Sequence, residues 1–184
     1  MRSKPLLLAL ALCVLAGSFS LPAHARRAFS AGMYHSFKGF GLCASAQRSE
    51  ADYHSFLVYA DITGLPFNRY DDKQCGVKLA YSHPHILWRR TGDGIPLRFY
   101  LGPGVSAGWV RDLGQGRFGI CTALNCCAGM RLDYRKSLRL HIESCAELGM
   151  HIKPRGQGLS NEISLYMNGL VQTILPQIRI EYAF

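Results

Sequence analysis

The sequence predicts an all-β protein: an eight-stranded antiparallel up-and-down transmembrane β-barrel preceded by a cleaved signal peptide. Three observations lead to this prediction. A short apolar run lies near the N-terminus, apolar and polar residues alternate in repeated segments, and the polar set mixes small residues with charges of both signs. Alternation with a period of two is typical of β-strands. An even number of such segments, separated by turn residues, is the pattern of an up-and-down barrel.

The N-terminal segment has the three regions of a signal peptide. Basic residues lie within the first four positions, an apolar run covers 6–15, and small and polar residues follow, ending with Ala-His-Ala at 23–25. The run is too short to cross a bilayer, which takes about 20 residues, and the Ala-x-Ala ending is typical of a cleavage site. The sequence therefore predicts a signal peptide at 1–25 and a barrel at 26–184.

The chain is basic, with a formal net charge of +9 at pH 7. A basic surface suggests an anionic partner. Nucleic acid is a poor partner for an exported protein, so lipid and lipopolysaccharide head groups are the expected anions. An ordinary excess of solubilising charge explains the composition equally well.

The clearest alternating segment runs from Leu138 to Lys153. Apolar residues occupy every second position with one interruption at Ser144, and the positions between them are polar or small. A helix would mix the two sets on one surface. A long strand with one apolar and one polar face is therefore predicted.

Seven further segments alternate in the same way, some less regularly. Together with the long segment they make eight predicted strands. The other seven lie at 39–45, 56–62, 76–82, 97–109, 118–130, 163–168 and 177–184.

The two faces suggest which side looks inward. The interior of an eight-stranded barrel is barely wide enough for side chains, and the polar face offers small residues and ion pairs that fit such a lumen. The apolar face offers large groups suited to lipid and to interfacial aromatic girdles. These large groups include Phe99, Trp109, Tyr182 and Phe184. A soluble lipocalin-like ligand-binding barrel has the same period with its faces reversed, and it remains an alternative.

The last seven residues, Ile-Arg-Ile-Glu-Tyr-Ala-Phe at 178–184, end the chain on an aromatic residue. This segment resembles the C-terminal strand signal of small, porin-like bacterial outer-membrane β-barrel proteins, and the stretches at 100–108 and 166–169 resemble parts of the same family. The resemblance implies a Gram-negative outer membrane and recognition of the last strand by the barrel-insertion machinery. The residues that match the signal are Ile178, Ile180, Tyr182 and Phe184.

Six of the seven cysteines lie after residue 25, where an exported chain meets an oxidising compartment that permits disulfides. No CxxC pair is present, and the adjacent Cys126 and Cys127 would point to opposite faces of a strand. A cysteine metal site is therefore not expected. Packing as small residues on strands is the favoured interpretation.

His141, Glu143 and Glu147 share one predicted strand face, where a carboxylate could orient an imidazole for acid–base work. No Ser or Cys nucleophile has a recognisable spacing to this histidine. An internal ion-pair network is predicted instead, because unpaired charges in a narrow interior are costly. Its predicted members are Arg98, Arg139, His141, Glu143, Glu147, Arg179 and Glu181.

His83 and His85 flank Pro84 in a predicted loop. Two histidines without a third ligand are more often part of a solvated loop than of a metal site, so no metal or cofactor is predicted.

Basic residues also gather in the predicted connections after the third and fifth strands. If the chain starts in the periplasm, both connections face outward on one rim, where arginine offers bidentate contacts to the phosphates of lipopolysaccharide. Ordinary charged loop tips are the alternative. The predicted contact residues are Arg89, Arg90, Arg131, Arg135 and Lys136.

No nucleotide-binding loop, zinc signature or nucleophile elbow is present. The predicted function is that of a non-enzymatic outer-membrane barrel with a filled lumen, structural or adhesive through its outer loops. A lipid-modifying membrane enzyme of the same architecture is the main alternative.

Overall fold

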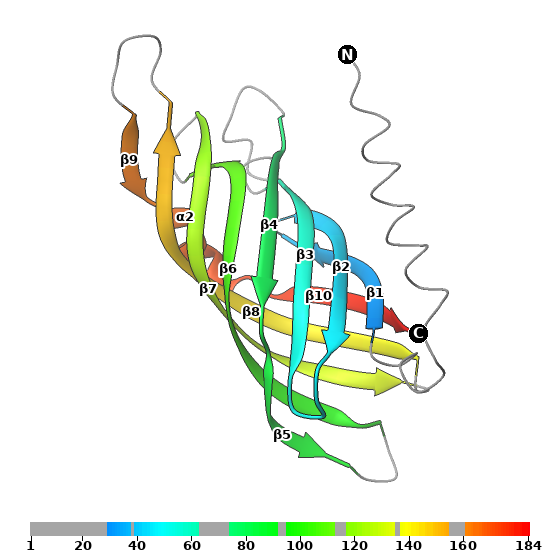
Figure 1. Cartoon of the computed structure of the whole chain (residues 1–184). Helices are drawn as coiled ribbons and strands as arrows, with labels where there is room; N and C mark the ends of the chain where they lie inside the picture. The colour runs from blue at the N-terminus through cyan, green and yellow to red at the C-terminus, as the bar shows by residue number, and fades with distance from the viewer. Residues whose placement is uncertain are drawn as a thin grey trace.

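In the computed structural model, ten strands form one antiparallel sheet that closes on itself (Figure 1). The structure describes residues 29–37, 39–62, 74–91, 95–112, 117–134, 137–154 and 161–184. The strands are β1 (Phe29–Ser36), β2 (Gly39–Gln47), β3 (Tyr53–Asp61), β4 (Gly76–Ser82), β5 (His85–Arg90), β6 (Leu97–Arg111), β7 (Phe118–Tyr134), β8 (Leu138–Lys153), β9 (Glu162–Leu165) and β10 (Gln177–Ala183).

The barrel closes because β10 pairs with β1 on one side and with β8 on the other. Both β4 and β5 pair with β6, and both β9 and β10 pair with β8, so each of these two pairs fills a single place in the wall. We call each such place a stave. The ten strands thus make eight antiparallel staves, as the sequence predicts.

The strands differ in length. β6, β7 and β8 have 15, 17 and 16 residues, whereas β1 to β4 and β10 have seven to nine. A transmembrane strand needs only about 9–11 residues. The long strands therefore rise beyond the β1–β2 hairpin, and β9 pairs with this raised end of β8 (Figure 1).

The interior is polar and the exterior is apolar. Large apolar side chains such as Met33 and Leu124 are 70% and 68% exposed on the outer face. The buried charged or titratable polar side chains are Asp61, Lys78, Arg111, Asp112, Arg131, His141, Glu143, Glu147, His151, Lys153, Arg179 and Glu181. A water-soluble barrel has the opposite arrangement, so the described residues form the wall of a membrane barrel.

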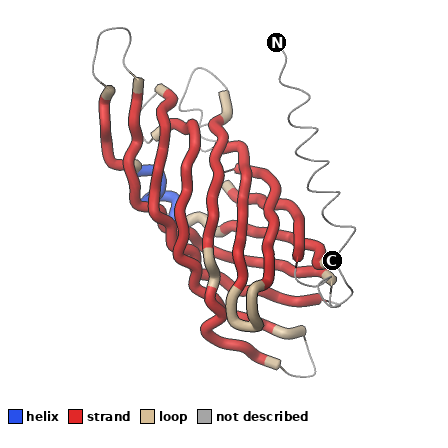
Figure 2. The backbone as a smooth tube through the Cα atoms, in the orientation of Figure 1, coloured by secondary structure: helices blue, strands red, loops and turns tan. Residues whose placement is uncertain are grey.

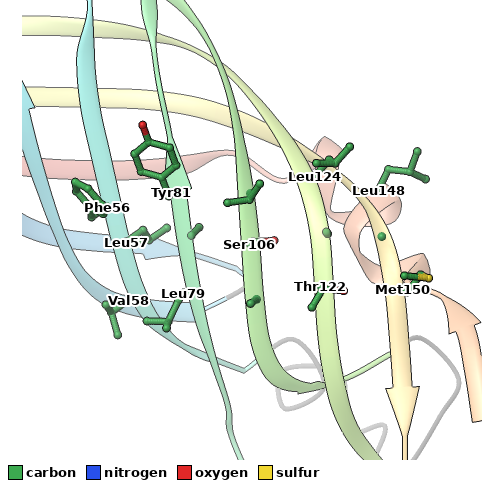
Figure 3. Close-up of a pocket in the computed structure, with 15 residues that line it drawn as sticks. Phe56, Leu57, Val58, Leu79, Tyr81, Ser106, Thr122, Leu124, Leu148 and Met150 are labelled. Atoms are coloured by element: carbon green, nitrogen blue, oxygen red, sulfur yellow. The ribbon is translucent and has the colours of Figure 1, made fainter. Parts of the chain in front are cut away.

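An open apolar groove crosses the outer face of β3, β4, β6, β7 and β8 (Figure 3). Its volume is about 750 Å³, and its lining includes small residues such as Ala107 and Thr122 beside larger apolar ones. Two rows of register partners line it, Phe56-Tyr81-Val105-Leu124-Leu148 and Val58-Leu79-Ala107-Thr122-Met150. Such a wall suits contact with lipid chains.

Two strands were not predicted. β1 alternates, but its outward positions include Ala31 and His35 as well as large apolar residues, so its pattern is weak. The sequence predicts a loop around Pro84; in the structure β5 begins at His85 and continues the stave of β4.

The predicted strand at 163–168 is wrong in its second half. The strand ends at Leu165, and a short helix, α2 (Met167–Val171), and a 3₁₀ turn, η2 (Gln172–Ile174), lead to β10 (Figure 2). The Asp112 carboxylate accepts hydrogen bonds from the backbone N–H groups of Met167 (3.1 Å) and Asn168 (2.8 Å), which caps the first turn. This cap comes from a distant part of the chain, so local sequence does not reveal it.

Glycine lets α2 approach the wall closely. A Cβ atom at Gly169 would lie 2.5 Å from the carbonyl oxygen of Glu147 on β8.

Among the described residues, no helix has the length and apolar character needed to cross a membrane.

One pair of cysteines is bonded inside the lumen. Cys127 on β7 and Cys145 on β8 are register partners and form a disulfide. Cys126, next to Cys127, is exposed on the outer face, as the alternation predicts, whereas Cys43 and Cys121 are buried free thiols. The disulfide joins two strands that are already neighbours.

The face assignment is tested by placing arginine at two outward leucines. Leu124 lies within β7 and Leu138 at the rim, where β8 begins. We expect Leu124→Arg to lower the free energy of unfolding by about 2–4 kcal/mol and Leu138→Arg by about 0–1 kcal/mol, because the penalty depends on membrane depth. Urea unfolding in lipid vesicles, followed by tryptophan fluorescence, measures both. Two equally mild effects would contradict the membrane assignment.

Candidate functional site in the barrel lumen

The charged and polar side chains in the described part of the lumen include three connected groups. The Arg179 cluster comprises Ser30, Ser45, Ser55, Tyr100, His141, Glu143, Arg179 and Glu181. The Asp133 cluster comprises Arg98, Arg131, Asp133 and Arg139. The Lys78 cluster comprises Lys78, Glu147 and Tyr166.

Arg179 on β10 is the centre of the first cluster. Its Nη2 lies 2.9 Å from Glu143 Oε2 on β8, and its Nη1 lies 3.7 Å from Glu181 Oε1 on β10. Nη1 also donates a hydrogen bond to the hydroxyl of Ser55 on β3. All of these side chains are buried. Two carboxylates therefore face one guanidinium, and the group ties three strands together.

The contacts of His141 define its protonation. Its Nδ1 lies 3.3 Å from Arg179 Nη2, which can only donate, so Nδ1 is an acceptor and Nε2 carries the proton. Nε2 lies 3.8 Å from Glu181 Oε2. Tyr100 donates its hydroxyl proton to Glu143 Oε2 at 2.6 Å. This imidazole is fully buried, and its Nε2 makes no hydrogen bond within the described part of the chain.

Glu181 completes the Arg179 cluster through hydroxyl donors. Ser30 on β1 and Ser45 on β2 donate to its two carboxylate oxygens at 2.6 and 3.0 Å. Arg139 Nη1 in turn donates to Ser30 Oγ at 3.0 Å. A buried carboxylate on β10 is thus satisfied by hydroxyl groups of the adjacent strand β1 and of β2 beyond it.

The Asp133 cluster has a surplus of positive charge. Asp133 on β7 lies 3.1 Å from the Nε atoms of Arg98 and Arg131 and 3.8 Å from that of Arg139. Arg131 also stacks over the ring of Tyr53 at 5.4 Å. Three guanidinium groups face this carboxylate, and Arg139 also donates to Ser30.

The Lys78 cluster joins β4 to β8. The Lys78 ammonium is fully buried and pairs with the Glu147 carboxylate. It lies 3.3 Å from the hydroxyl of Tyr166 and 4.5 Å from the centre of that ring, so it gains a cation–π contact as well.

The predicted lumen residues divide among the three clusters. The structure brings His141, Glu143, Arg179 and Glu181 together, with Arg139 between them and the Asp133 cluster. Arg98 joins Asp133, and Glu147 lies apart, with Lys78. Sequence reasoning missed Lys78, Asp133, Tyr53, Tyr100 and Tyr166 as members. The first four lie on inward faces of the strands, but only the register shows what they contact.

The prediction for the basic connections needs correction. Arg131 is not a loop-tip residue, because its side chain is 2% exposed inside the lumen. Arg89 pairs with Glu50 at 3.1 Å and Arg90 is exposed, while Arg135 and Lys136 lie outside the described residues.

The rim that carries these basic residues was also placed wrongly. Because β1 adds one strand before the first predicted strand, the β5–β6 and β7–β8 connections lie at the end of the barrel where β1 begins and β10 ends. The sequence predicted that they face the opposite end.

The residues of the C-terminal signal face outward along β10. Ile178, Ile180, Tyr182 and Phe184 are between 42% and 55% exposed. The Phe184 N–H donates to the carbonyl of Phe29 at 2.9 Å, which places the two phenylalanines at one rim.

His83 and His85 do not lie in a solvated loop. They stand on the outer face where β4 passes into β5, beside Asp52. Burial and the neighbouring His85 and His54 lower the pKa of His83. Hydrogen bonds from Ser49 and His85 lower the pKa of Asp52.

An eight-stave antiparallel barrel with a charged interior and an apolar exterior is the fold of an outer-membrane β-barrel protein. Among solved structures, the N-terminal β-barrel domain of Pseudomonas aeruginosa OprF is similar, with a TM-score of 0.52 over 85% of this chain and 95% of that chain. The two share 11% sequence identity, so the similarity shows the fold alone. No protein-family model and no curated protein matches the sequence.

The buried pair of Lys78 and Glu147 is open to a double-mutant test. We expect Lys78→Met or Glu147→Leu alone to lower the free energy of unfolding by about 3–5 kcal/mol, because each leaves a buried charge without its partner. The double variant should recover most of that loss. Urea unfolding of the four proteins in one detergent measures this coupling. Additive losses in the double variant would show that the two charges do not stabilise one another.

Proposed function

We propose that the protein resides in the outer membrane as a structural or binding barrel whose lumen does not conduct. Binding is assigned to the connections at the end of the barrel opposite the start of β1. The apolar outer wall supports the membrane location, and the fold shared with the OprF barrel domain agrees with it.

The filling of the lumen is the observation that carries this proposal. Large side chains from different staves meet in the interior and are at most 2% exposed. They are Tyr34, Tyr53, Tyr100, Arg131 and Arg179. Ion pairs and hydrogen bonds hold them in place, so a path for hydrated ions would require breaking buried pairs.

The lengths of the connections support an orientation. At the end where β1 begins, the connections cover 48–52, 91–96 and 135–137; at the other end, they cover 37–38, 62–75, 112–117 and 154–161. Outer-membrane barrels have short periplasmic turns and longer extracellular loops. The start of β1 is therefore assigned to the periplasmic side.

This orientation changes the expected lipid partner of the basic rim. Arg89 and Arg90 then face the phosphates of the periplasmic leaflet. The sequence predicts lipopolysaccharide as a partner, and in this orientation the connections at the outer end would bind it.

The closed lumen is tested by recording in planar lipid bilayers. We expect no stepwise conductance in concentrated KCl, with a general porin as the positive control. Ohmic steps would contradict the filled lumen.

Incubating the same preparation with lipid A and with phospholipids should release no fatty acid, and release would favour the lipid-modifying enzyme instead.

Recognition by the insertion machinery is tested with two phenylalanines at one rim. Phe184 and Phe29 are each 46% exposed, so replacing either with alanine removes similar packing. We expect Phe184→Ala to lower the amount in the outer-membrane fraction far more than Phe29→Ala does, with similar stabilities in detergent. Equal yields of the two variants in cells would mean that Phe184 acts only in packing.

Fractionation of cells tests the proposed location. Recovery of the wild-type protein in the soluble periplasm would contradict it.

A further inference from the structure

Four potential metal ligands meet on the outer face of the barrel, near the rim where β3 begins. Asp52 comes from the β2–β3 connection and His54 from β3, while His83 and His85 flank the break between β4 and β5. They lie apart from the lumen, because Tyr53 between the first two points inward. None of the lumen clusters includes them.

The geometry brings three of these groups within reach of one ion. Asp52, His83 and His85 each offer one ligand atom, and these three atoms lie within 4.8 Å of one another. Asp52 Oδ1 is 2.5 Å from His85 Nδ1, and the rings of His83 and His85 are 4.7 Å apart at their centres. The ring of His54 lies 4.8 Å from that of His83.

Backbone contacts hold the three ligands in place. Asp52 and His85 form a β-bridge, and the Ile86 N–H donates to the Ala51 carbonyl at 2.7 Å. The His83 N–H donates to the carbonyl of Pro103 at 2.8 Å. Ser49 Oγ donates to Asp52 Oδ2 at 3.0 Å, which orients the carboxylate. Backbone hydrogen bonds to the wall therefore hold His83 and His85, and the β-bridge holds the connection that carries Asp52 against them.

The cluster also contains an unsatisfied donor or acceptor. His83 Nδ1 is buried and makes no hydrogen bond within the described part of the chain. His54 uses Nδ1 to contact the hydroxyl of Tyr81 at 2.9 Å. Several imidazoles side by side repel one another as cations, whereas neutral imidazoles and a carboxylate are the ligands that Zn²⁺ and its neighbours prefer.

We propose that Asp52, His83 and His85 form a binding site for a divalent transition-metal ion, with Zn²⁺ as the expected ion. Three protein ligands leave the fourth position of a tetrahedral ion open, beside His54. The bound ion would connect the β2–β3 turn to the junction of β4 and β5 at the proposed periplasmic rim. The site does not depend on the proposed function, since it needs only the barrel.

The site is tested by calorimetric titration with ZnCl₂ of the purified protein in detergent micelles, without a histidine tag. The exposed thiols of Cys75 and Cys126 are alkylated first, because thiolates also bind zinc. We expect one ion per chain and an affinity at least about 10-fold weaker in the His83→Ala/His85→Ala variant. His35→Ala, which removes an exposed histidine of β1, should bind as the wild type does.

Two further measurements keep the outcome clear. Co²⁺ should give the visible absorption of a tetrahedral ion without a sulfur charge-transfer band. In the wild type, Zn²⁺ should slow the modification of His83 and His85 by diethylpyrocarbonate but not the modification of His35. This measurement uses the wild-type protein alone, so it does not depend on the folding of a variant. Absence of stoichiometric binding, unchanged affinity in the double variant, or equal modification with and without Zn²⁺ would overturn the proposal.

Discussion

The closed barrel depends chiefly on the contacts that satisfy the buried guanidinium of Arg179. Arg179 stands on the last strand and reaches Ser55 on β3, Tyr100 on β6 and Glu143 on β8. A buried charge without partners costs several kcal/mol, so these contacts must form together or not at all. The last strand is thus fixed to staves across the lumen as well as to its neighbours in the wall. Closure of the sheet therefore brings the partners of Arg179 together.

A second tie of the same kind acts between β4 and β8. Lys78 and Glu147 lie on staves that are not adjacent, so their pairing fixes the distance between opposite walls. The Asp133 cluster differs, because three arginines share one carboxylate and the excess charge is left near the rim. Water and lipid phosphate at the rim can screen such an excess, whereas the middle of the lumen cannot tolerate it. The charge balance therefore changes with depth.

Alternation in the sequence was enough to predict the barrel and most inward positions, but not their partners. Lys78 and Glu147 are both inward by pattern, yet they are 69 positions apart and only strand register brings them together. The pattern failed where outward positions were not uniformly large and apolar, as at Ala31 and His35 in β1. That one missing strand reversed the predicted ends of the barrel. Asp52 escaped notice as a ligand for the same reason as Lys78, because it meets His85 only through pairing.

The last stave is interrupted between β9 and β10, which leaves backbone groups of β8 without a strand partner. β8 pairs with β10 up to Glu143 and with β9 from Met150, which leaves the stretch between them without a strand on that side. α2 and η2 lie against β8 in this stretch, and because so short a helix leaves most of its own N–H and C=O groups without a partner inside the helix, other contacts must satisfy them. The Tyr166 N–H donates to the Gly149 carbonyl at 2.9 Å, and Ser144 donates its hydroxyl to the Thr173 carbonyl. Side-chain and backbone contacts thus replace the missing ladder. The wall is held there by fewer bonds between strands, so this segment is the part of the described barrel that should open at the lowest free energy.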